Sequence, residues 1–322
     1  AGLMDLIPRV QQAWTEEQDA LLDVGEQIAQ ALNPSSRQLP GAPLDLAVLS
    51  LASDQFERNF DPEYGGFGPH PKFPSPHTLL FLLRQWQRTG DETSLNMVET
   101  TLQAMRSGGI YDQLGYGFHR YSTDAQWLVP HFEKMLYDQA MLAMAYPEAY
   151  LATGDERYRK TAEEIFAYIE RDMTASEGGF FSAEDADSEG EEGIFYLWTV
   201  DEMEDVLGAE SAALAIEHFG MTSEGNYFDA VVGERTGKNI LHVSKPNSEE
   251  QIESIRQQLY ERRETRIHPY KDDKILTDWN GLMIAALAKA AQAFDEPAYA
   301  LSLIHISEPT RLDARSRMPS SA

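Results

Sequence analysis

The sequence predicts an all-α fold built from antiparallel helical hairpins. Apolar residues recur at helical spacing along most of the chain, and the segments with this pattern are joined by short connections. Gly-Gly pairs at 65–66, 108–109 and 178–179 each follow a predicted helix and precede a loop rich in polar and aromatic residues. This weak internal repeat indicates hairpin units that place their loops on one face.

The N-terminal half is predicted to contain four helices, over residues 9–32, 44–60, 75–90 and 93–105. In the first, apolar residues such as Trp14 and Leu21 recur on one side, and Pro34 stops the helix. Ser75 followed by Pro76 combines an N-cap with a proline in the first helical turn, so it marks the start of the third.

The C-terminal half is predicted to contain five helices, over residues 131–153, 156–173, 199–208, 248–266 and 279–294. Pro130 opens the first of them. Thr199 and Glu202 have the spacing of a capping box, and Gly208 is expected to end the helix that they begin.

The composition indicates a large folded domain that does not bind membranes or nucleic acid. With 322 residues and 42% hydrophobic content, the chain can bury a large core, which we expect to belong to one domain. The net charge of -27, from 53 acidic and 26 basic residues, opposes binding to nucleic acid and to anionic lipid. No apolar run approaches the roughly 20 residues of a membrane span and no signal peptide is visible, so we expect a cytoplasmic protein.

The segment 108–140 is the most distinctive part of the chain. It places His, Arg, Lys, Asp and Glu side chains beside Trp and Tyr in a glycine-broken loop that leads into a predicted helix. Buried polar groups are costly unless they are paired, so this mixture indicates either a lined cavity or a network that holds the loop.

Together with three further motifs, this segment resembles a known family. The motifs are GGFGPHPKFPSP at 65–76, GGFFSAEDADSEGEEGIFYLWT at 178–199 and DDKILTDWNGLM at 272–283. In this order they are similar to the thioredoxin-domain-containing proteins related to spermatogenesis-associated protein 20. The resemblance covers roughly residues 1–300 and implies an (α/α) toroid of the six-hairpin glycosidase type, akin to N-acylglucosamine and cellobiose 2-epimerases.

The resemblance also implies what this chain lacks. Family members begin with a thioredoxin-like domain that carries a cysteine motif, whereas this chain has no Cys and hence no thiol chemistry. In the full-length protein that domain is an expected intramolecular partner.

This chain also departs from the family at one position of the loop. Tyr116 stands where the family usually has Gly, so its side chain restricts the backbone of the loop. We assign 1–300 to an incomplete toroid, and 301–322, which resembles translated sequencing-adapter sequence, to no domain.

Two histidines are candidate catalytic residues. In a helix opened by Pro130, His131 would lie near the N-terminal end, with Lys134 and Asp138 on the same side. The helix dipole lowers the pKa of a His there, so His131 is a candidate general base. The alternative is that His131 and Glu133 satisfy backbone donors of the first turn.

The second candidate histidine precedes that helix. His119 and Arg120 lie in the glycine-broken loop, where they either serve a site or brace the loop with hydrogen bonds. Sequence alone leaves both interpretations open.

An acidic segment provides candidate carboxylates. Residues 179–182 and 194–198 are predicted to pair as a β-hairpin whose tip contains Asp185 and Asp187. These two could act as acid and base across a sugar ring or bind a cation such as Ca²⁺. The spacing lacks the Gly and distal Glu of an EF-hand loop, so we expect no metal site, and no cofactor is expected.

Aromatic and polar residues near the motifs are candidates for binding a sugar, because sugar rings stack their C–H faces on aromatic rings. The alternative is that the large rings fill the core of a helical toroid and that Asn280 caps a helix. The candidate binding residues are Arg120, Tyr121, Trp127, Glu133, Lys134, Tyr137, Tyr196, Trp198, Trp279 and Asn280.

These observations support three hypotheses of function. The first is a sugar-active enzyme, either an epimerase or isomerase that uses His acid/base chemistry or a hydrolase that uses paired carboxylates. The second is a non-catalytic binding or regulatory module. In the third, the toroid selects clients for the absent thioredoxin-like domain. A small-molecule carbohydrate is the expected partner.

Overall fold

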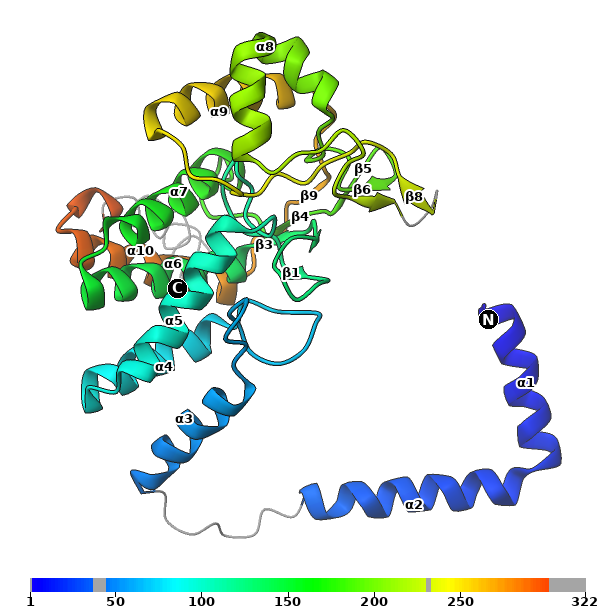
Figure 1. Cartoon of the computed structure of the whole chain (residues 1–322). Helices are drawn as coiled ribbons and strands as arrows, with labels where there is room; N and C mark the ends of the chain where they lie inside the picture. Colours follow the sequence, from blue (N-terminus) through cyan, green and yellow to red (C-terminus); the bar gives the residue numbers. More distant parts are fainter. Residues whose placement is uncertain (1, 37–44, 230–232, 301–322) are drawn as a thin grey trace, which may run out of the picture. The chain divides into compact units, whose positions relative to one another are not determined.

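The computed structural model describes residues 2–36, 45–229 and 233–300. The chain divides into two compact units, Ala1–Ser50 and Leu51–Ala322. The predicted all-α class, with antiparallel helical hairpins and small β insertions, is confirmed in the described residues (Figure 1). The assignment of residues 1–300 to one incomplete toroid stays a prediction, and 301–322 lie outside the described residues. Among the described helices, none is long and apolar enough to cross a membrane.

The first unit consists mainly of two helices, α1 (Leu3–Glu16) and α2 (Gln18–Ser36). The single helix predicted over 9–32 is wrong, because the backbone at Glu17 leaves the helical region, with φ -133° and ψ 31°. The Trp14 side chain is 50% exposed, and other large apolar side chains of both helices are exposed as well. The apolar pattern therefore predicted the helices correctly, but the described residues of this unit do not bury their apolar side.

The second unit contains two antiparallel hairpins, formed by α4 (Pro76–Thr89) with α5 (Glu92–Ser107) and by α6 (Leu136–Thr153) with α7 (Glu156–Asp172). The same sequence, Thr-Gly-Asp-Glu, connects each pair, at 89–92 and 153–156. The Gly adopts the left-handed conformation that ends the first helix, with φ 72° and 73°. The Asp side chain then accepts a backbone N–H of the second helix and caps it.

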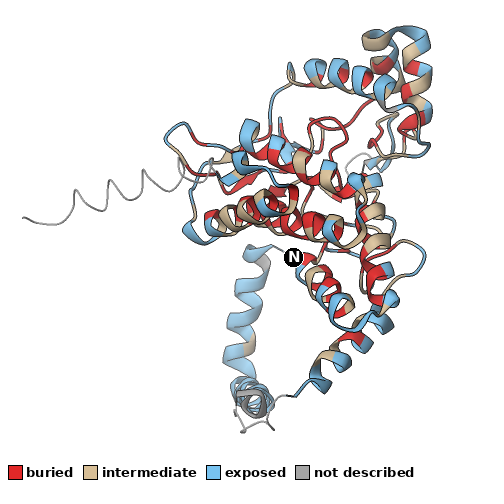
Figure 2. Cartoon of the chain, turned by 90° about the vertical axis from the view of Figure 1, so that its left-hand side faces the viewer, coloured by how far each residue is buried: buried red, intermediate tan, exposed pale blue. Residues whose placement is uncertain are grey.

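Helix α6 is the centre of this unit. Helices α4, α7 and α10 (Thr277–Phe294) all pack against it, and most of its side chains are buried (Figure 2). A helix that is apolar all round is expected in such a position. Helix α3 (Ala47–Asn59), which crosses the boundary between the units, contacts α4 through the rings of Phe56 and Phe81.

Helices α4, α6 and α10 point their N-terminal ends the same way. The ring centroids of Tyr137 and Trp279 lie 4.9 Å apart, so the starts of α6 and α10 meet. Near the other ends, Glu148 of α6 accepts hydrogen bonds from Arg84 of α4 and Lys289 of α10, at 2.7 and 2.8 Å. The segments before these helices are the sequence motifs, so the parallel arrangement gathers the motifs at one end of the helices.

A second helical pair, α8 (Val200–His218) and α9 (Glu249–Arg263), packs around its own small core (Figure 1). The predicted capping box of Thr199 and Glu202 is confirmed. The expectation that Gly208 ends the helix begun by this box is confirmed, because Gly208 leaves the helical region, with φ 72° and ψ 163°, and the rest of α8 is a second helical segment beyond this kink.

Short antiparallel strands connect the motifs. In one sheet β3 (Lys134–Met135), β4 (Ala183–Glu184) and β9 (Lys271–Asp272) pair in that order, so segments far apart in the sequence are joined. The remaining pairs are β1 (Tyr121–Ser122) with β2 (Pro130–His131), β5 (Asp187–Ser188) with β6 (Glu191–Glu192) and β7 (Phe228–Asp229) with β8 (Glu234–Arg235).

Two predictions about these segments are wrong. The helix expected from His131 begins at Leu136, because residues 130–131 and 134–135 pair as strands with other segments. The β-hairpin expected between 179–182 and 194–198 forms instead within its predicted tip, as β5 and β6. His131, Lys134 and Asp138 therefore do not share one helix face.

Candidate functional site

Side chains of the motif segments, together with Tyr168 of α7 and Arg263 of α9, form two polar layers at the N-terminal ends of α4, α6 and α10. One layer is buried, and we call it the inner network. Its members are Asp112, Lys134, Tyr168, Glu184 and Arg263. The other layer is partly exposed, and we call it the outer cluster. Its members are Arg120, Tyr121, His131, Glu133, Tyr137, Glu192 and Trp279.

Asp112 is the centre of the inner network. Its carboxylate accepts hydrogen bonds from Arg263 Nη1 at 2.7 Å and Lys134 Nζ at 2.8 Å. The backbone N–H groups of Leu114 and Gly115 also donate to it. Burial raises the pKa of Asp112, but Arg263 and Lys134 lower it more, so it lies well below its usual value. The network thus holds an ionised carboxylate whose charge is fully paired.

Lys134 serves this network rather than an open site. Its Nζ also donates to the Tyr116 carbonyl at 2.9 Å and lies 4.5 Å from the ring centroid of Tyr168. The Tyr168 hydroxyl in turn donates to Glu184 at 2.9 Å. Gly115 is required here, because a Cβ at this position would come within 2.1 Å of Arg263.

His119 is buried beside the inner network, against the rings of Phe132 and Tyr196, and its side chain is 1% exposed. Its Nδ1 lies 2.9 Å from the Phe132 carbonyl, so this nitrogen carries the proton and donates. Burial, reinforced by the Lys134 charge, lowers its pKa to about 3. Of the two interpretations of His119, the geometry matches the one in which a neutral imidazole braces the loop.

His131 occupies the middle of the outer cluster. Its Nδ1 lies 2.7 Å from Glu192 Oε1 and its Nε2 lies 3.7 Å from Glu133 Oε2. Glu133 is also paired with Arg120 at 2.8 Å. The Tyr121 ring stacks on the imidazole, with 5.1 Å between centroids. The cluster therefore joins an imidazole, two carboxylates and a guanidinium beside an aromatic surface.

Asp138 lies beneath the outer cluster, in the first turn of α6. Its side chain is 8% exposed, and burial raises its pKa to about 7, although Arg120 and Tyr137 favour the charged form. Glu133 adds to the upward shift. Sequence reasoning noted Asp138 through its spacing from His131 but gave it no role.

The remaining predicted site residues lie elsewhere. Asp185 and Asp187 are exposed, and the Asp185 carboxylate accepts the backbone N–H of Ala186 within its own turn. Trp127 is buried, and its Nε1 donates to the Tyr64 carbonyl at 2.9 Å. Trp198 is also buried, under the Arg266 guanidinium.

Two further predicted residues support the loops. Tyr196 is buried against the rings of His119 and Phe132. The Asn280 side chain accepts the N–H of Phe180 and donates to its carbonyl, at 2.8 and 3.0 Å. Asn280 thus attaches α10 to the motif at 178–199.

The structure therefore brings together six of the predicted residues and adds others. Arg120, Tyr121, His131, Glu133, Tyr137 and Trp279 share the outer cluster. Glu192, from the same acidic segment as Asp185 and Asp187, belongs there too. Phe73 extends the aromatic surface, since the centroids of its ring and the Tyr121 ring lie 4.9 Å apart. Among the described residues, no group of three or more His, Cys, Asp or Glu is placed to hold a metal ion.

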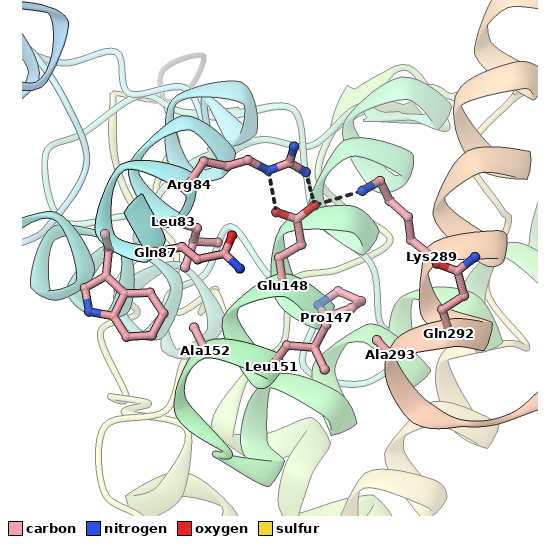
Figure 3. Close-up of a pocket in the computed structure, with 11 residues that line it drawn as sticks. Leu83, Arg84, Gln87, Pro147, Glu148, Leu151, Ala152, Lys289, Gln292 and Ala293 are labelled. Atoms are coloured by element: carbon pink, nitrogen blue, oxygen red, sulfur yellow. Dashed lines mark hydrogen bonds and ion pairs between the residues drawn. The ribbon is translucent and has the colours of Figure 1, made fainter. Parts of the chain in front are cut away.

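A separate groove lies at the opposite ends of the helices. It has a volume of about 360 Å³, and the ion pairs of Glu148 with Arg84 and Lys289 cross it (Figure 3). Leu83, Pro147 and Leu151 contribute apolar walls. Because the motif residues are at the other ends of α4, α6 and α10, this groove is distinct from the outer cluster.

Comparison with known proteins confirms the family resemblance. No family model matches the chain. Spermatogenesis-associated protein 20 of Homo sapiens is 39% identical over 327 residues, which cover 89% of this chain and 41% of that protein. The rat protein of the same name is 38% identical, and an uncharacterized protein of Caenorhabditis elegans is 31% identical. The chain spans about 41% of the length of the first two relatives.

Solved structures with similar backbones include sugar-active enzymes. Cellobiose 2-epimerase from Spirochaeta thermophila is 17% identical, with 85% of each chain covered and a TM-score of 0.37. A D-mannose isomerase is 11% identical, with 84% of this chain and 88% of the other covered and a TM-score of 0.37. A family 76 glycoside hydrolase from a bovine Bacteroides thetaiotaomicron strain is 11% identical, with coverages of 72% and 46% and a TM-score of 0.35.

Proposed function

Because the chain is homologous to spermatogenesis-associated protein 20 over most of its own length, we propose that it is the helical part of such a protein and that its outer cluster binds a carbohydrate. We further propose that His131 transfers a proton in an isomerase or epimerase reaction. The observation that carries the proposal is the partly exposed His131, which lies between Glu192 and Glu133 beside the Tyr121 ring.

The outer cluster suits a sugar for two reasons. Aromatic rings of Tyr121 and Phe73 provide a surface on which the C–H face of a sugar can stack. Carboxylates and the Arg120 guanidinium supply acceptors and donors for hydroxyl groups, which both donate and accept hydrogen bonds. A small number of fixed polar groups beside an apolar surface is typical of ligand sites.

The hydrogen bonding of His131 supports the proposed proton transfer. Its Nδ1–H donates to Glu192, so Nε2 has a free lone pair and can accept a proton from the carbon next to an open-chain sugar's carbonyl. Arg120 would stabilise the negative charge that develops on the sugar oxygen. The isomer forms when this proton returns to the neighbouring carbon and the hydroxyl proton of the first carbon passes to the former carbonyl oxygen. Epimerisation instead requires a second acid that returns a proton to the opposite face of the first carbon.

A hydrolase is the second candidate, and one observation favours it. Asp138, with a pKa raised to about 7, and Glu133, paired with Arg120, are two carboxyl groups in contrasting environments. Such a pair can provide an acid and a base for glycoside hydrolysis. Asp185 and Asp187, the carboxylates that the sequence predicts for this role, are both exposed, and Asp187 belongs to strand β5.

Two other proposals concern the full-length protein. The helical part would be a non-catalytic binding module if it binds sugar without turnover, or it would select clients for a thioredoxin-like domain elsewhere in the protein. We propose a cytoplasmic location for it.

The test is a His131→Ala variant of the full-length protein, assayed for turnover of mono- and disaccharides and for thermal stability. We expect turnover to fall by ~10²- to 10⁴-fold with little change in melting temperature, because the partly exposed imidazole contributes proton transfer rather than packing. His268→Ala is the matched control, since His268 is an exposed histidine also near a glutamate, Glu264. Unchanged turnover in His131→Ala would exclude His131 from the mechanism, and absence of sugar binding in the unsubstituted protein would refute the carbohydrate site.

A further inference from the structure

Three aromatic side chains form a row on one face of a small antiparallel sheet. Lys72 pairs with Ser122 of β1 through two backbone hydrogen bonds, at 2.8 and 2.9 Å. On the other side of β1, Tyr121 pairs with His131 of β2. Because side chains alternate between the two faces of a strand, this register places Phe73, Tyr121 and His131 beside one another on the same face.

The distances between the rings agree with this order. The ring centroids of Phe73 and Tyr121 lie 4.9 Å apart, and those of Tyr121 and His131 lie 5.1 Å apart. Tyr121 is on the middle strand and neighbouring strands are ~4.8 Å apart, so the Phe73 ring lies about 10 Å from the imidazole. The row therefore starts at the proposed proton-transfer residue and ends at Phe73.

The two faces of this sheet differ in burial. Lys72, Ser122 and Pro130, on the opposite face, are buried. Phe73 is 50% exposed, and the other two members of the row are partly exposed. An exposed aromatic ring that continues the surface of a proposed ligand site is a candidate for binding rather than for core packing.

The backbone that carries Phe73 is firmly held. The neighbouring Lys72 Nζ donates to the Asp61 carboxylate at 2.5 Å and to two backbone carbonyl groups, each at 2.8 Å. On the other side, Pro74 is buried and restricts the backbone of Phe73 to extended conformations. The ring is thus presented on a fixed backbone, so a ligand that binds it pays little to order the site.

We propose that Phe73 binds a second sugar unit while the first unit reacts at His131. This inference rests on the proposed carbohydrate function and specifies its substrate class, a disaccharide or longer oligosaccharide rather than a monosaccharide. One sugar ring cannot stack on Phe73 and also place its reacting carbon at the imidazole, because Tyr121 lies between them. The second unit would stack its C–H face on the part of the Phe73 ring that Tyr121 leaves uncovered.

The test compares matched sugars in the full-length protein, with binding measured by calorimetry. The sets are D-glucose with cellobiose and maltose, and D-mannose with β-1,4-mannobiose. We expect at least one disaccharide to bind about tenfold more tightly than its monosaccharide. Phe73→Ala should weaken binding of that disaccharide by about fivefold or more and leave the monosaccharide unchanged, because it removes only the stacking ring. Phe73→Tyr keeps a ring and should retain the preference.

Phe228→Ala is the matched control, because Phe228 is also on a two-residue strand and is 56% exposed. It should leave binding and the melting temperature unchanged. Disaccharides bound no more tightly than monosaccharides, or Phe73→Ala weakening both kinds of sugar equally or neither, would overturn the inference and leave the proposed function standing. A melting temperature lowered by Phe73→Ala but not by the control would also overturn it, since the ring would then pack against another part of the protein. Failure of every sugar to bind the unsubstituted protein would overturn both.

Discussion

Asp112 and Asp138 are buried aspartates of the same motif, yet their pKa values shift in opposite directions. Asp112 accepts from two cationic side chains and two backbone N–H groups, and these interactions outweigh the cost of burial. Asp138 has one oxygen without a partner among the described residues, so desolvation dominates. At the residue scale, the hydrogen-bond and ion-pair partners of a buried aspartate therefore decide the direction in which its pKa shifts.

The sequence predicted the outer cluster in part. Arg120, His131 and Glu133 are close together in one motif, so their proximity could be read from the chain. Glu192 reaches His131 from a segment 61 residues away, through strands too short to show a pattern. The residues next to His119 and His131 in the sequence do not show which of the two histidines is buried. Their different burial depends on packing between distant segments.

The buried His119 makes a testable contribution to the pH dependence of stability. Its folded pKa of about 3 lies below the ordinary value of 6.5, so below that value the unfolded chain binds a proton that the folded protein does not. The free energy of unfolding should therefore fall by about 2 kcal/mol between about pH 7 and about pH 5 through this residue alone. In His119→Asn, which keeps a donor for the Phe132 carbonyl, denaturant unfolding should show a smaller loss over this range. An identical pH dependence in both proteins would contradict the assignment.

At the scale of elements, the repeated Thr-Gly-Asp-Glu connections explain why the hairpins form. Each ends one helix with a left-handed Gly and begins the next with an Asp cap, so a connection of two residues reverses the chain. The identical tetrapeptides are visible in the sequence and are a stronger repeat than the Gly-Gly pairs on which the hairpin prediction rested.

Helices could be predicted where apolar spacing and the residues at the helix ends, all close together in the sequence, determine them. The helices predicted over 44–60, 93–105, 156–173 and 279–294 are confirmed with ends shifted by a few residues. The N-cap role predicted for Ser75 is wrong, since its backbone is left-handed and its side chain makes no capping bond. The strands could not be placed, because each is two residues long and its pairing depends on distant partners.

The capping box of α8 provides a test at this scale. Thr199 Oγ1 accepts the Glu202 N–H at 3.2 Å, and Glu202 Oε2 accepts the Thr199 N–H at 2.9 Å. Thr199→Ala should lower the free energy of unfolding by about 1 kcal/mol, because a backbone donor loses its partner. Thr199→Ser keeps the hydroxyl and should retain most of the stability in urea unfolding. Equal losses in the two variants would show that the methyl group, rather than the cap, is responsible.

For the whole molecule, the dominant physical property is its charge. The chain has 53 acidic and 26 basic residues, so most carboxylates cannot be paired with a cation. Many described ion pairs, such as that of Lys245 with Glu217, are at the surface, where each contributes little. Repulsion among the excess carboxylates should therefore oppose the compact state.

This balance predicts how stability responds to salt. Raising NaCl from about 0.01 M to about 0.1 M shortens the screening length from ~30 to ~10 Å, which weakens repulsion between separated carboxylates more than it weakens short ion pairs. The melting temperature should therefore rise by a few degrees, since about 1 kcal/mol corresponds to ~2 to 4 °C in a protein of this size class. KCl at the same ionic strength is the control and should act equally, because screening does not depend on the ion. A melting temperature that falls with either salt would mean that surface pairs such as Arg84 with Glu148 outweigh the repulsion, and the excess negative charge would then not limit stability.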